Sequence, residues 1–152
     1  NEFLTDTRGT GIMNSYLYGY EPYRGDFPIR FTGSIVSDRQ GKGVPYALFN
    51  LEPRGVLFII AGERVYEGMI IGVHSRNNDL VVNPLKGKQL TNVRASGNDD
   101  AVLLTTPINV TLEFALEFIN DDELIEITPS SLRIRKKFLK EHERKKAARA
   151  AS

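Results

Sequence analysis

Residues 55–74 read GVLFIIAGERVYEGMIIGVH and contain two short runs of β-forming residues, Gly55–Ile60 and Met69–His74. Two further runs of this kind, Ile29–Ser37 and Val44–Glu52, precede them. Turn-forming clusters such as SDRQGKG and EPRG separate the runs. This spacing predicts an antiparallel sheet or a barrel-like arrangement.

The segment Pro107–Asn120 has a different period and predicts a helix. Its apolar residues recur at helical spacing along one stripe, and Glu113 and Glu117 lie on the opposite face. Thr111 stands where its hydroxyl can cap the first turn. We therefore expect an amphipathic helix that packs on the sheet through the stripe Leu112, Ala115, Leu116 and Ile119.

Strand-like alternation returns after this helix. Leu124–Thr128 and Leu132–Arg135 flank the turn sequence TPSS, which predicts a hairpin. In its second strand the leucine and isoleucine should face inward and the two arginines outward. Phe138–Ala150 then has the composition of a terminal helix rich in Lys, Arg and Ala, with few apolar positions. Together these patterns predict an α+β fold, mainly β, in which amphipathic helices pack on an antiparallel, barrel-like sheet.

A further strand is predicted near the beginning of the chain. Ile12–Tyr20 alternates and places Tyr16 and Tyr18 on the same face as Tyr20. Aromatic faces suit stacking on unpaired nucleotides, so these tyrosines and the nearby Tyr23 could bind bases. Tyrosines on one face of a sheet more often pack against other side chains, and we expect packing here.

The composition is that of a globular protein. Of 152 residues, 41% are hydrophobic and 26% are charged, which argues against a disordered chain. No cysteine is present, so disulfides and thiolate metal sites are excluded and a reducing compartment is favoured. The longest apolar run, Val56–Ala61, is far shorter than the roughly 20 residues that cross a bilayer. With no secretory signal in evidence, we expect a cytoplasmic protein that does not enter a membrane.

The net charge of +1 hides a segregation of acids and bases. Residues 113–126 hold six acids and no base, whereas residues 132–152 hold nine bases against two acids. A second basic segment, residues 76–94, holds four bases against one acid. Two basic segments in a nearly neutral chain indicate a polyanionic partner. For the terminal segment, a solvated charged tail is the competing interpretation.

The polar stretch from Ser75 to Asp100 is too long for an ordinary connection. Loops of more than about 12–15 residues are uncommon in compact domains and are usually functional or disordered. Its bases suit phosphate, its amides and hydroxyls suit base edges or ribose hydroxyls, and the pair Asn83-Pro84 favours a turn. A segment of this composition orders better against RNA than alone, which favours RNA contact over a merely loose loop.

The sequence offers little for catalysis. GKGVP and KGKQL lack the spacing of a phosphate-binding P-loop, and His74 and His142 are too far apart to form a metal-ligand pair on one helix. His74 and Ser75 are neighbours in an extended segment, so their side chains point to opposite faces. The adjacent acids beginning at Asp99 and Asp121 lack the spacing of a calcium loop. We predict no catalytic residue, no metal site and no small-molecule substrate.

Five blocks of the chain carry a family resemblance: EFLTDTRGTGIM, GKGVPYALFNLEPRG, VYEGMIIGVHSRNNDL, LKGKQLTNVRASG and LEFALEFINDDELIEITPSSLRIRKK. In this order they resemble the C-terminal portion of the BipA/TypA translational GTPases, which are related to elongation factor G. The resemblance extends over essentially the whole chain, which makes it much more specific than any single motif.

The resemblance implies two parts. Residues 1–23 are similar to the tail of the ferredoxin-like domain V that the family shares with elongation factor G. Residues 24–152 resemble the C-terminal domain peculiar to the family, with a basic terminal helix at 138–150. We expect the chain to be a piece of a longer protein. Gly11–Tyr20, without its native sheet neighbours, should then be either poorly ordered or paired to a substitute edge.

The same resemblance implies binding to the ribosome at the site of elongation factors. The family's long loop is thought to touch large-subunit ribosomal RNA and the A-site tRNA, and here it matches residues 75–100. The residues expected to contact RNA are Arg76, Asn77, Lys86, Lys88, Gln89, Asn92 and Arg94. A secondary basic surface is expected from Arg133, Arg135, Lys136, Lys137, Lys140, Arg144, Lys145 and Lys146. GTP and magnesium belong to a nucleotide-binding domain outside this sequence, so we expect no cofactor here, and a monomer.

The main hypothesis is therefore a non-catalytic ribosome- and RNA-binding module of a translational GTPase that acts in large-subunit assembly and stress adaptation. The alternative is a protein-interaction module that uses the acidic stretch 113–126 and the basic terminal helix. A small hydrolase would instead require a pocket with a perturbed acid–base pair.

Overall fold

The elements of the fold come from a computed structural model, which describes residues 3, 6–23, 25, 30–87 and 103–151. The strands are β1 (Ser34–Ser37), β2 (Gly41–Lys42), β3 (Gly55–Leu57), β4 (Arg64–Val65), β5 (Met69–His74), β6 (Leu80–Val82), β7 (Glu123–Thr128) and β8 (Ser131–Lys136). The helices are α2 (Pro45–Leu51), the short 3-10 helix η1 (Glu52–Arg54), α3 (Leu112–Phe118) and α4 (Glu141–Ala151).

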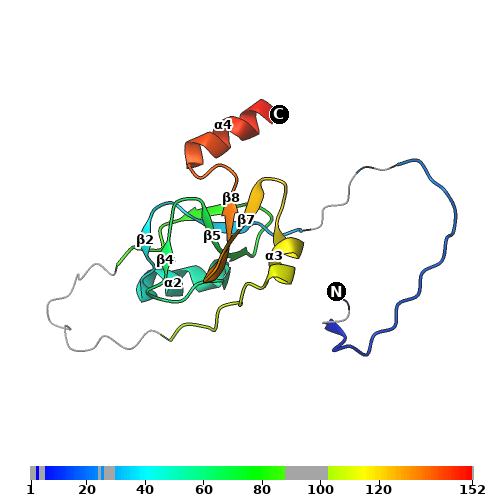
Figure 1. The fold of residues 1–152 in the computed structure, drawn as a ribbon, viewed down its shortest axis with the longest axis horizontal. Coiled ribbons are helices and arrows are strands. Elements are labelled where there is room, and N and C mark those ends of the chain that lie inside the picture. The colour runs from blue at the N-terminus through cyan, green and yellow to red at the C-terminus, as the bar shows by residue number, and fades with distance from the viewer. Residues whose placement is uncertain (1–2, 4–5, 24, 26–29, 88–102, 152) are drawn as a thin grey trace.

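Strand β5 is the centre of the main sheet (Figure 1). It pairs antiparallel with β1 along one edge, while β3 and β8 share its other edge. Strand β6 pairs parallel with β1, and β7 pairs with β8, which gives the order β6-β1-β5-β8-β7. Strands β2 and β4 form a separate small sheet. The α+β fold predicted from the sequence is confirmed, but the described strands form an open sheet and no closed barrel.

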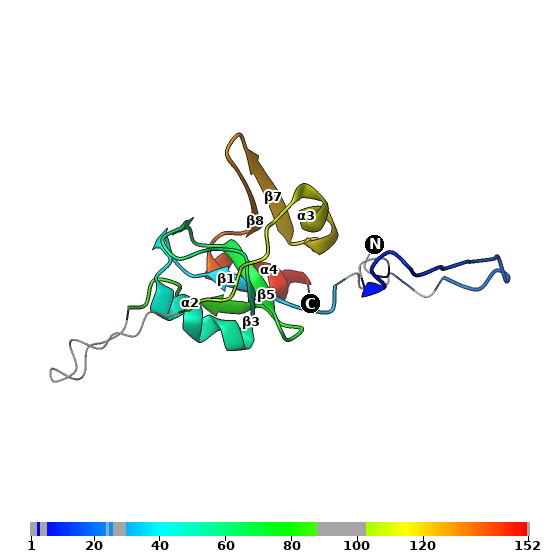
Figure 2. The same cartoon turned by 90° about the horizontal axis from the view of Figure 1, so that it is seen from below.

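Each face of the sheet carries one helix and one apolar core. Neighbouring residues of a strand point to opposite faces, so Ile35 and Ile71 enter the core with α2, whereas Val36 and Ile70 enter the core with α3. Figure 2 shows α2 and α3 on opposite sides of the sheet. Burying one such side chain stabilises the fold by about 1.5–3 kcal/mol, so both helices are held by burial rather than by their own propensity.

Helix α2 replaces a strand that the sequence pattern predicts within Val44–Glu52. Pro45 occupies the start of the helix, where its missing N–H breaks no intrahelical hydrogen bond. Ala47, Leu48 and Leu51 are buried along one side at helical spacing. The segment is short and rich in apolar residues, a pattern that fits either structure, and burial of one helical stripe decides between them.

Helix α3 is confirmed, and it packs through Ala115 and Ile119 of the predicted stripe, whereas the two leucines of that stripe are exposed. The hydroxyl of Thr111 accepts a hydrogen bond from a backbone N–H of the first turn at 3.3 Å, as the predicted cap requires. Ala115 and Phe118 are buried, whereas Leu116 is 60% exposed. The ring of Phe118 lies edge-on to that of Phe58, with centroids 5.5 Å apart. This aromatic contact places Phe118 against the sheet, and Leu112 and Leu116 face away from it.

The predicted hairpin and terminal helix are also present. Strands β7 and β8 pair in register from Glu123 and Lys136 to Thr128 and Ser131. Ile134 is buried, as its alternation predicts. Helix α4 begins a few residues later than the sequence pattern indicates.

The strand predicted over Ile12–Tyr20 is wrong. Residues 10–23 form neither strand nor helix, and Figure 1 shows this part of the chain extending away from the sheet. Tyr16, Tyr18 and Tyr20 are 87%, 92% and 94% exposed, so the expected packing of the tyrosines is wrong as well. A strand needs a neighbour to satisfy its backbone groups, and no strand of the described chain pairs with this segment.

Candidate RNA-binding surface

The polar stretch of residues 75–100 begins as a turn and a strand rather than as one continuous loop. Residues 75–79 form the turn between β5 and β6, which carries Arg76 and Asn77, both exposed. Strand β6 follows because its three apolar residues complete the edge of the sheet. The second connection, from β6 to α3, then begins, and Lys86 lies at its start. Arg76 and Lys86 are therefore held at opposite ends of β6.

Backbone contacts fix the first turn. The N–H of Gly33 donates to the carbonyl of Arg76 at 2.6 Å, and a side chain at Gly33 would collide with the carbonyl of Asn78. His74 is 6% exposed, and its Nδ1 lies 2.6 Å from the same Asn78 carbonyl. These contacts hold Arg76 and Asn77 at the tip of a rigid turn, and they engage His74 in structure.

The second connection leaves and returns at the same corner of the molecule, formed by α2 and η1. In its first limb, residues 83–87, the carbonyl of Pro84 accepts a hydrogen bond from the backbone at the start of α2 at 3.0 Å. In its second limb, residues 103–111, Thr105 donates to the carboxylate of Glu52 from its backbone N–H at 2.6 Å and from its hydroxyl at 2.8 Å. Four of the predicted RNA contacts lie between these limbs, outside the described residues: Lys88, Gln89, Asn92 and Arg94.

Two exposed cations, Arg54 and Lys86, lie at this α2–η1 corner. They line one cavity of about 390 Å³ and form no ion pair with any described residue. The carbonyl of Arg54 accepts hydrogen bonds from the N–H of Ser75 at 2.9 Å and from its hydroxyl at 2.7 Å, so η1 also borders the turn that carries Arg76. The sequence does not single out Arg54, because the EPRG cluster indicates only a turn. The pairing of β3 with β5 places Arg54 at the α2–η1 corner.

The secondary basic surface predicted on β8 and α4 divides by exposure. Its exposed members are Lys137, Lys140, Lys145 and Lys146, and its half-buried members are Arg133, Arg135 and Arg144. Lys145 pairs with Glu141 one helical turn away at 2.6 Å. Arg144 donates to the carbonyl of Phe138 at 3.0 Å and to that of Leu139. Part of this charge is therefore used within α4 and the segment that leads to it.

Lys136 does not belong to that surface, and its predicted place there is wrong. Its side chain is 2% exposed, and its ammonium pairs with Asp122 at 2.8 Å, with Glu123 at 2.9 Å and with Asp79. Lys136 and Ile134 stand two residues apart on β8, so both point inward. The basic run RIRKK gives no sign of this, because the acids that surround Lys136 come from other segments of the chain.

Glu123 joins Lys136 to the segment before β1. Its carboxylate accepts two hydrogen bonds from the guanidinium of Arg30 at 2.9 Å each and one from the hydroxyl of Ser34 at 2.6 Å. We call Arg30, Asp79, Asp122, Glu123 and Lys136 the buried ion cluster; its centre is buried, and the side chains of Asp79 and Asp122 at its rim are 38% and 60% exposed. Because Asp79 ends the turn that carries Arg76, the cluster fastens this turn to β8.

The two buried members of this cluster, Glu123 and Lys136, hold each other in their charged forms. Burial by itself raises the pKa of Glu123, but hydrogen bonds from Arg30 and Ser34 and the charge of Lys136 hold this pKa below its ordinary value. Burial likewise lowers the pKa of Lys136, and its carboxylate partners overcome this effect and raise the pKa above its ordinary value. Each group thus stabilises the charged form of the other.

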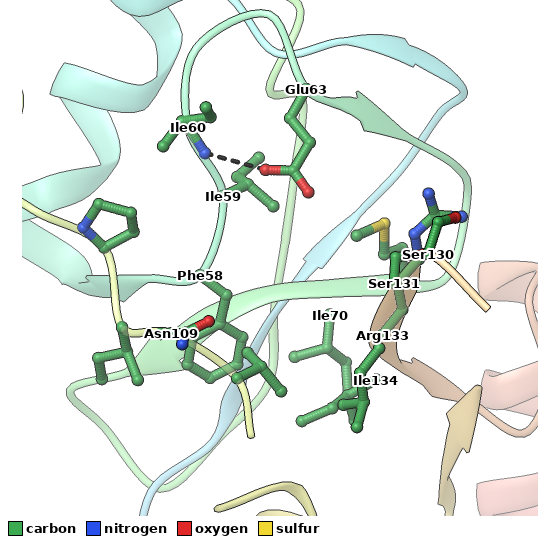
Figure 3. A pocket seen from close by; sticks show the side chains of 15 residues that line it. Phe58, Ile59, Ile60, Glu63, Ile70, Asn109, Ser130, Ser131, Arg133 and Ile134 are labelled. Carbon is green, nitrogen blue, oxygen red and sulfur yellow. Dashed lines mark hydrogen bonds between the residues drawn. The ribbon is translucent and has the colours of Figure 1, made fainter. Parts of the chain in front are cut away.

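A second cavity, of about 440 Å³, lies beside β8 and residues 107–110 (Figure 3). Its walls are largely apolar, as at Phe58, and its charged members are Glu63 and Arg133. The carboxylate of Glu63 accepts a hydrogen bond from the N–H of Ile60 at 3.1 Å and is engaged in its own turn. Ser130 and Ser131 also line this cavity, and no histidine is among its described lining residues to pair with them.

Metal and membrane sites find no support in the described ranges. Within them, no group of three or more His, Cys, Asp or Glu side chains could hold a metal ion. No helix in the same ranges is both long enough and apolar enough to span a bilayer.

Comparison with known proteins matches the chain to one family. The family model described as the TypA/BipA C-terminal domain matches residues 32–141. A protein of Escherichia coli K12, named large ribosomal subunit assembly factor BipA, is 56% identical over 151 residues, which are 99% of this chain and 25% of that protein. Proteins with the same name from Buchnera aphidicola and Haemophilus influenzae are 56% and 53% identical, over 97% and 99% of this chain and 24% and 25% of their own length. The chain spans about a quarter of the length of these curated relatives.

Proposed function

The chain belongs to the TypA/BipA C-terminal domain family, and on this premise we propose that it is a ribosome- and RNA-binding module of a translational GTPase that acts in large-subunit assembly and stress adaptation. The relatives are named for assembly of the large ribosomal subunit, and we extend that role to this protein. In this proposal the chain binds the ribosome and catalyses no reaction. It acts in the cytoplasm and as a monomer. GTP and magnesium would be bound elsewhere in a longer protein.

The α2–η1 corner is the observation that carries this proposal. Its two cations are exposed and without ion pairs in the described chain, and both limbs of the second connection are hydrogen-bonded to it. Free cations at the root of a long polar segment suit a phosphate backbone, which binds through neutralised charge and released counterions. Cations already paired within a protein contribute much less to such binding.

The proposed RNA contacts are Arg76, Asn77, Lys86, Lys88, Gln89, Asn92 and Arg94, directed at large-subunit ribosomal RNA and the A-site tRNA. A second, weaker contact would be formed by the exposed lysines in α4 and in the segment between β8 and α4, which are Lys137, Lys140, Lys145 and Lys146. Residues 1–23 would be the tail of a ferredoxin-like domain, and residues 24–152 would form the binding module.

The acidic stretch supports the alternative, a protein-interaction module, less well. Asp122 and Glu123 are engaged with Lys136 in the buried ion cluster. Glu126 accepts a hydrogen bond from the hydroxyl of Tyr66 at 2.7 Å and lies 3.9 Å from the guanidinium of Arg135. Much of the negative charge that the alternative requires for a partner is therefore already neutralised within the chain.

Binding to purified large ribosomal subunits across a salt series tests the proposal. We expect the logarithm of the binding constant to fall with the logarithm of salt concentration, with a slope of about 0.7–0.9 per phosphate contact. The triple variant Lys86→Ala/Lys88→Ala/Arg94→Ala should bind more weakly and with a slope smaller by about 2–3. The matched control Lys137→Ala/Lys140→Ala/Lys146→Ala removes the same number of exposed cations from α4 and from the segment between β8 and α4. Equal weakening by both triple variants would refute a contact centred on the second connection, and a salt-independent affinity would refute the electrostatic mechanism.

A further inference from the structure

The cavity at the α2–η1 corner combines the groups that hold a single nucleotide. Tyr46 and Asn50 line it from α2, Arg54 lines it from η1, and Asn83 and Lys86 line it from the start of the second connection. Its volume of about 390 Å³ falls within the range of small-ligand sites. The remaining lining residues are apolar, and no carboxylate is among them. The cavity therefore pairs an aromatic ring and two cations with an apolar floor.

The two amide side chains at the rim each have a free group of opposite kind. The NH₂ group of Asn50 donates to the carbonyl of Tyr46 at 2.7 Å, which leaves its own carbonyl oxygen to accept. The carbonyl oxygen of Asn83 accepts from the N–H of Leu85 at 2.9 Å, which leaves its NH₂ group to donate. One acceptor and one donor match the edge of a base, which presents both kinds of group.

We propose that this cavity binds one unstacked nucleotide of single-stranded RNA, with the base against Tyr46 and between the two amides, and the flanking phosphates on Arg54 and Lys86. The inference rests on the proposed RNA-binding function and adds to it a binding site on the folded body, formed by α2, η1 and the first limb of the second connection. It also specifies the class of RNA. A base inside a duplex cannot leave its stack for such a cavity, whereas a base in a loop or a single strand can.

Anisotropy of a 5′-labelled RNA hexamer, in single-stranded form and within a longer blunt duplex that has no loop, tests the site with the whole chain. Tyr46→Leu removes the stacking face and should weaken single-strand binding about 5- to 150-fold. Phe49→Leu is the matched control, because Phe49 is 49% exposed on the same helix and does not line the cavity. It should change the affinity less than twofold. Arg54→Gln should lower the salt slope by about 0.7, which corresponds to one phosphate contact on a single strand.

Adenosine monophosphate as a competitor separates an RNA strand from a free nucleotide. Displacement of the hexamer only at concentrations far above those at which the hexamer itself binds supports the RNA site. Saturation by the mononucleotide at the affinity of the hexamer would overturn it in favour of a free nucleotide. Equal binding of the single strand and the blunt duplex, or equal affinities of the wild type and Tyr46→Leu, would also overturn it.

Failure of this site and failure of the proposed function give different results. If Tyr46→Leu binds the hexamer like the wild type while the Lys86/Lys88/Arg94 variant still loses ribosome binding, only the nucleotide site is wrong. If ribosome binding by the wild type is independent of salt, the proposed RNA-binding function is wrong, whereas full ribosome binding by the triple variant would place the contact outside the second connection. Circular dichroism and the urea midpoint of each variant establish that it is folded.

Discussion

Two groups of cations in this protein have the same chemistry and opposite roles. At the α2–η1 corner, Arg54 and Lys86 are exposed and form no ion pair with a described residue. In the buried ion cluster, Lys136 and Arg30 lie against carboxylates, and the side chain of Lys136 is 2% exposed. The first arrangement leaves charge for a partner, and the second uses it to join β8, β7 and the turn before β6. The role of a lysine here is decided by which acids the fold brings to it.

The largest change in the free energy of unfolding is expected from the substitution Lys136→Met. The substitution removes the cation shared by Asp79, Asp122 and Glu123, and removal of one partner from a buried ion pair costs about 3–5 kcal/mol. Arg30 still pairs with Glu123, and the two aspartates are partly exposed, so the cost should lie at the lower end, about 3 kcal/mol. We expect the free energy of unfolding, measured with urea, to fall by this amount. Its neighbour Lys137 is exposed, so Lys137→Met should change the free energy of unfolding by less than about 0.5 kcal/mol. Equal losses from the two variants would show that Lys136 is not buried among acids.

A smaller, pH-dependent effect is expected from Glu123→Gln. At neutral pH the variant should lose about 1.5–3 kcal/mol, the range for hydrogen bonds to a charged group. The pKa of Glu123 is lowered in the folded state, so its stabilisation is complete above the ordinary value of 4.5 and disappears as the pH falls through the lowered pKa. The difference between wild type and variant should therefore narrow on acidification below about pH 4.5. A difference that stays constant down to pH 2 would contradict this assignment.

Lys136 gives the opposite dependence at high pH. Its pKa is raised in the folded state, so its stabilisation is complete below the ordinary value of 10.5 and is lost as the pH rises through the raised pKa. The difference between the wild type and Lys136→Met should therefore begin to narrow only above about pH 10.5. Urea unfolding on both sides of this value measures it, and narrowing that is already complete at pH 9 would contradict the raised pKa.

A smaller effect on stability is expected from the substitution Thr105→Val at the α2–η1 corner. Thr105→Val removes the hydroxyl that donates to Glu52 at 2.8 Å and keeps the shape of the side chain, at a cost of about 0.5–1.5 kcal/mol. Because this bond holds the returning limb of the second connection, binding to large ribosomal subunits should weaken as well. Thr10→Val is a suitable control, since Thr10 lies in the N-terminal segment. Thr105→Val binding as tightly as this control would mean that the anchored limb is not needed for binding.

The sequence predicts the features that depend on neighbours in the chain. The Thr111 cap and the hairpin around TPSS are confirmed because each is decided within a few residues. Helix α2 was missed because a short apolar run has no period that separates helix from strand. Its structure depends on the sheet that it covers.

The candidate site follows the same division. Arg76 and Lys86 are exposed as expected, since polar turns and loops stay at the surface. The burial of Lys136 depends on Asp79, and the place of Arg54 depends on the pairing of β3 with β5, and both are contacts between distant segments. Sequence composition therefore predicts which segments carry exposed charge better than it predicts which charged residues the fold buries.

Hydrogen–deuterium exchange of the chain, alone and bound to large ribosomal subunits, is the most direct test of RNA binding at the α2–η1 corner. We expect new protection of backbone amides in Val44–Arg54 and in the limbs 83–87 and 103–108. The buried ion cluster should be equally protected in both states. New protection confined to β8 and α4, with the α2–η1 corner unchanged, would contradict it.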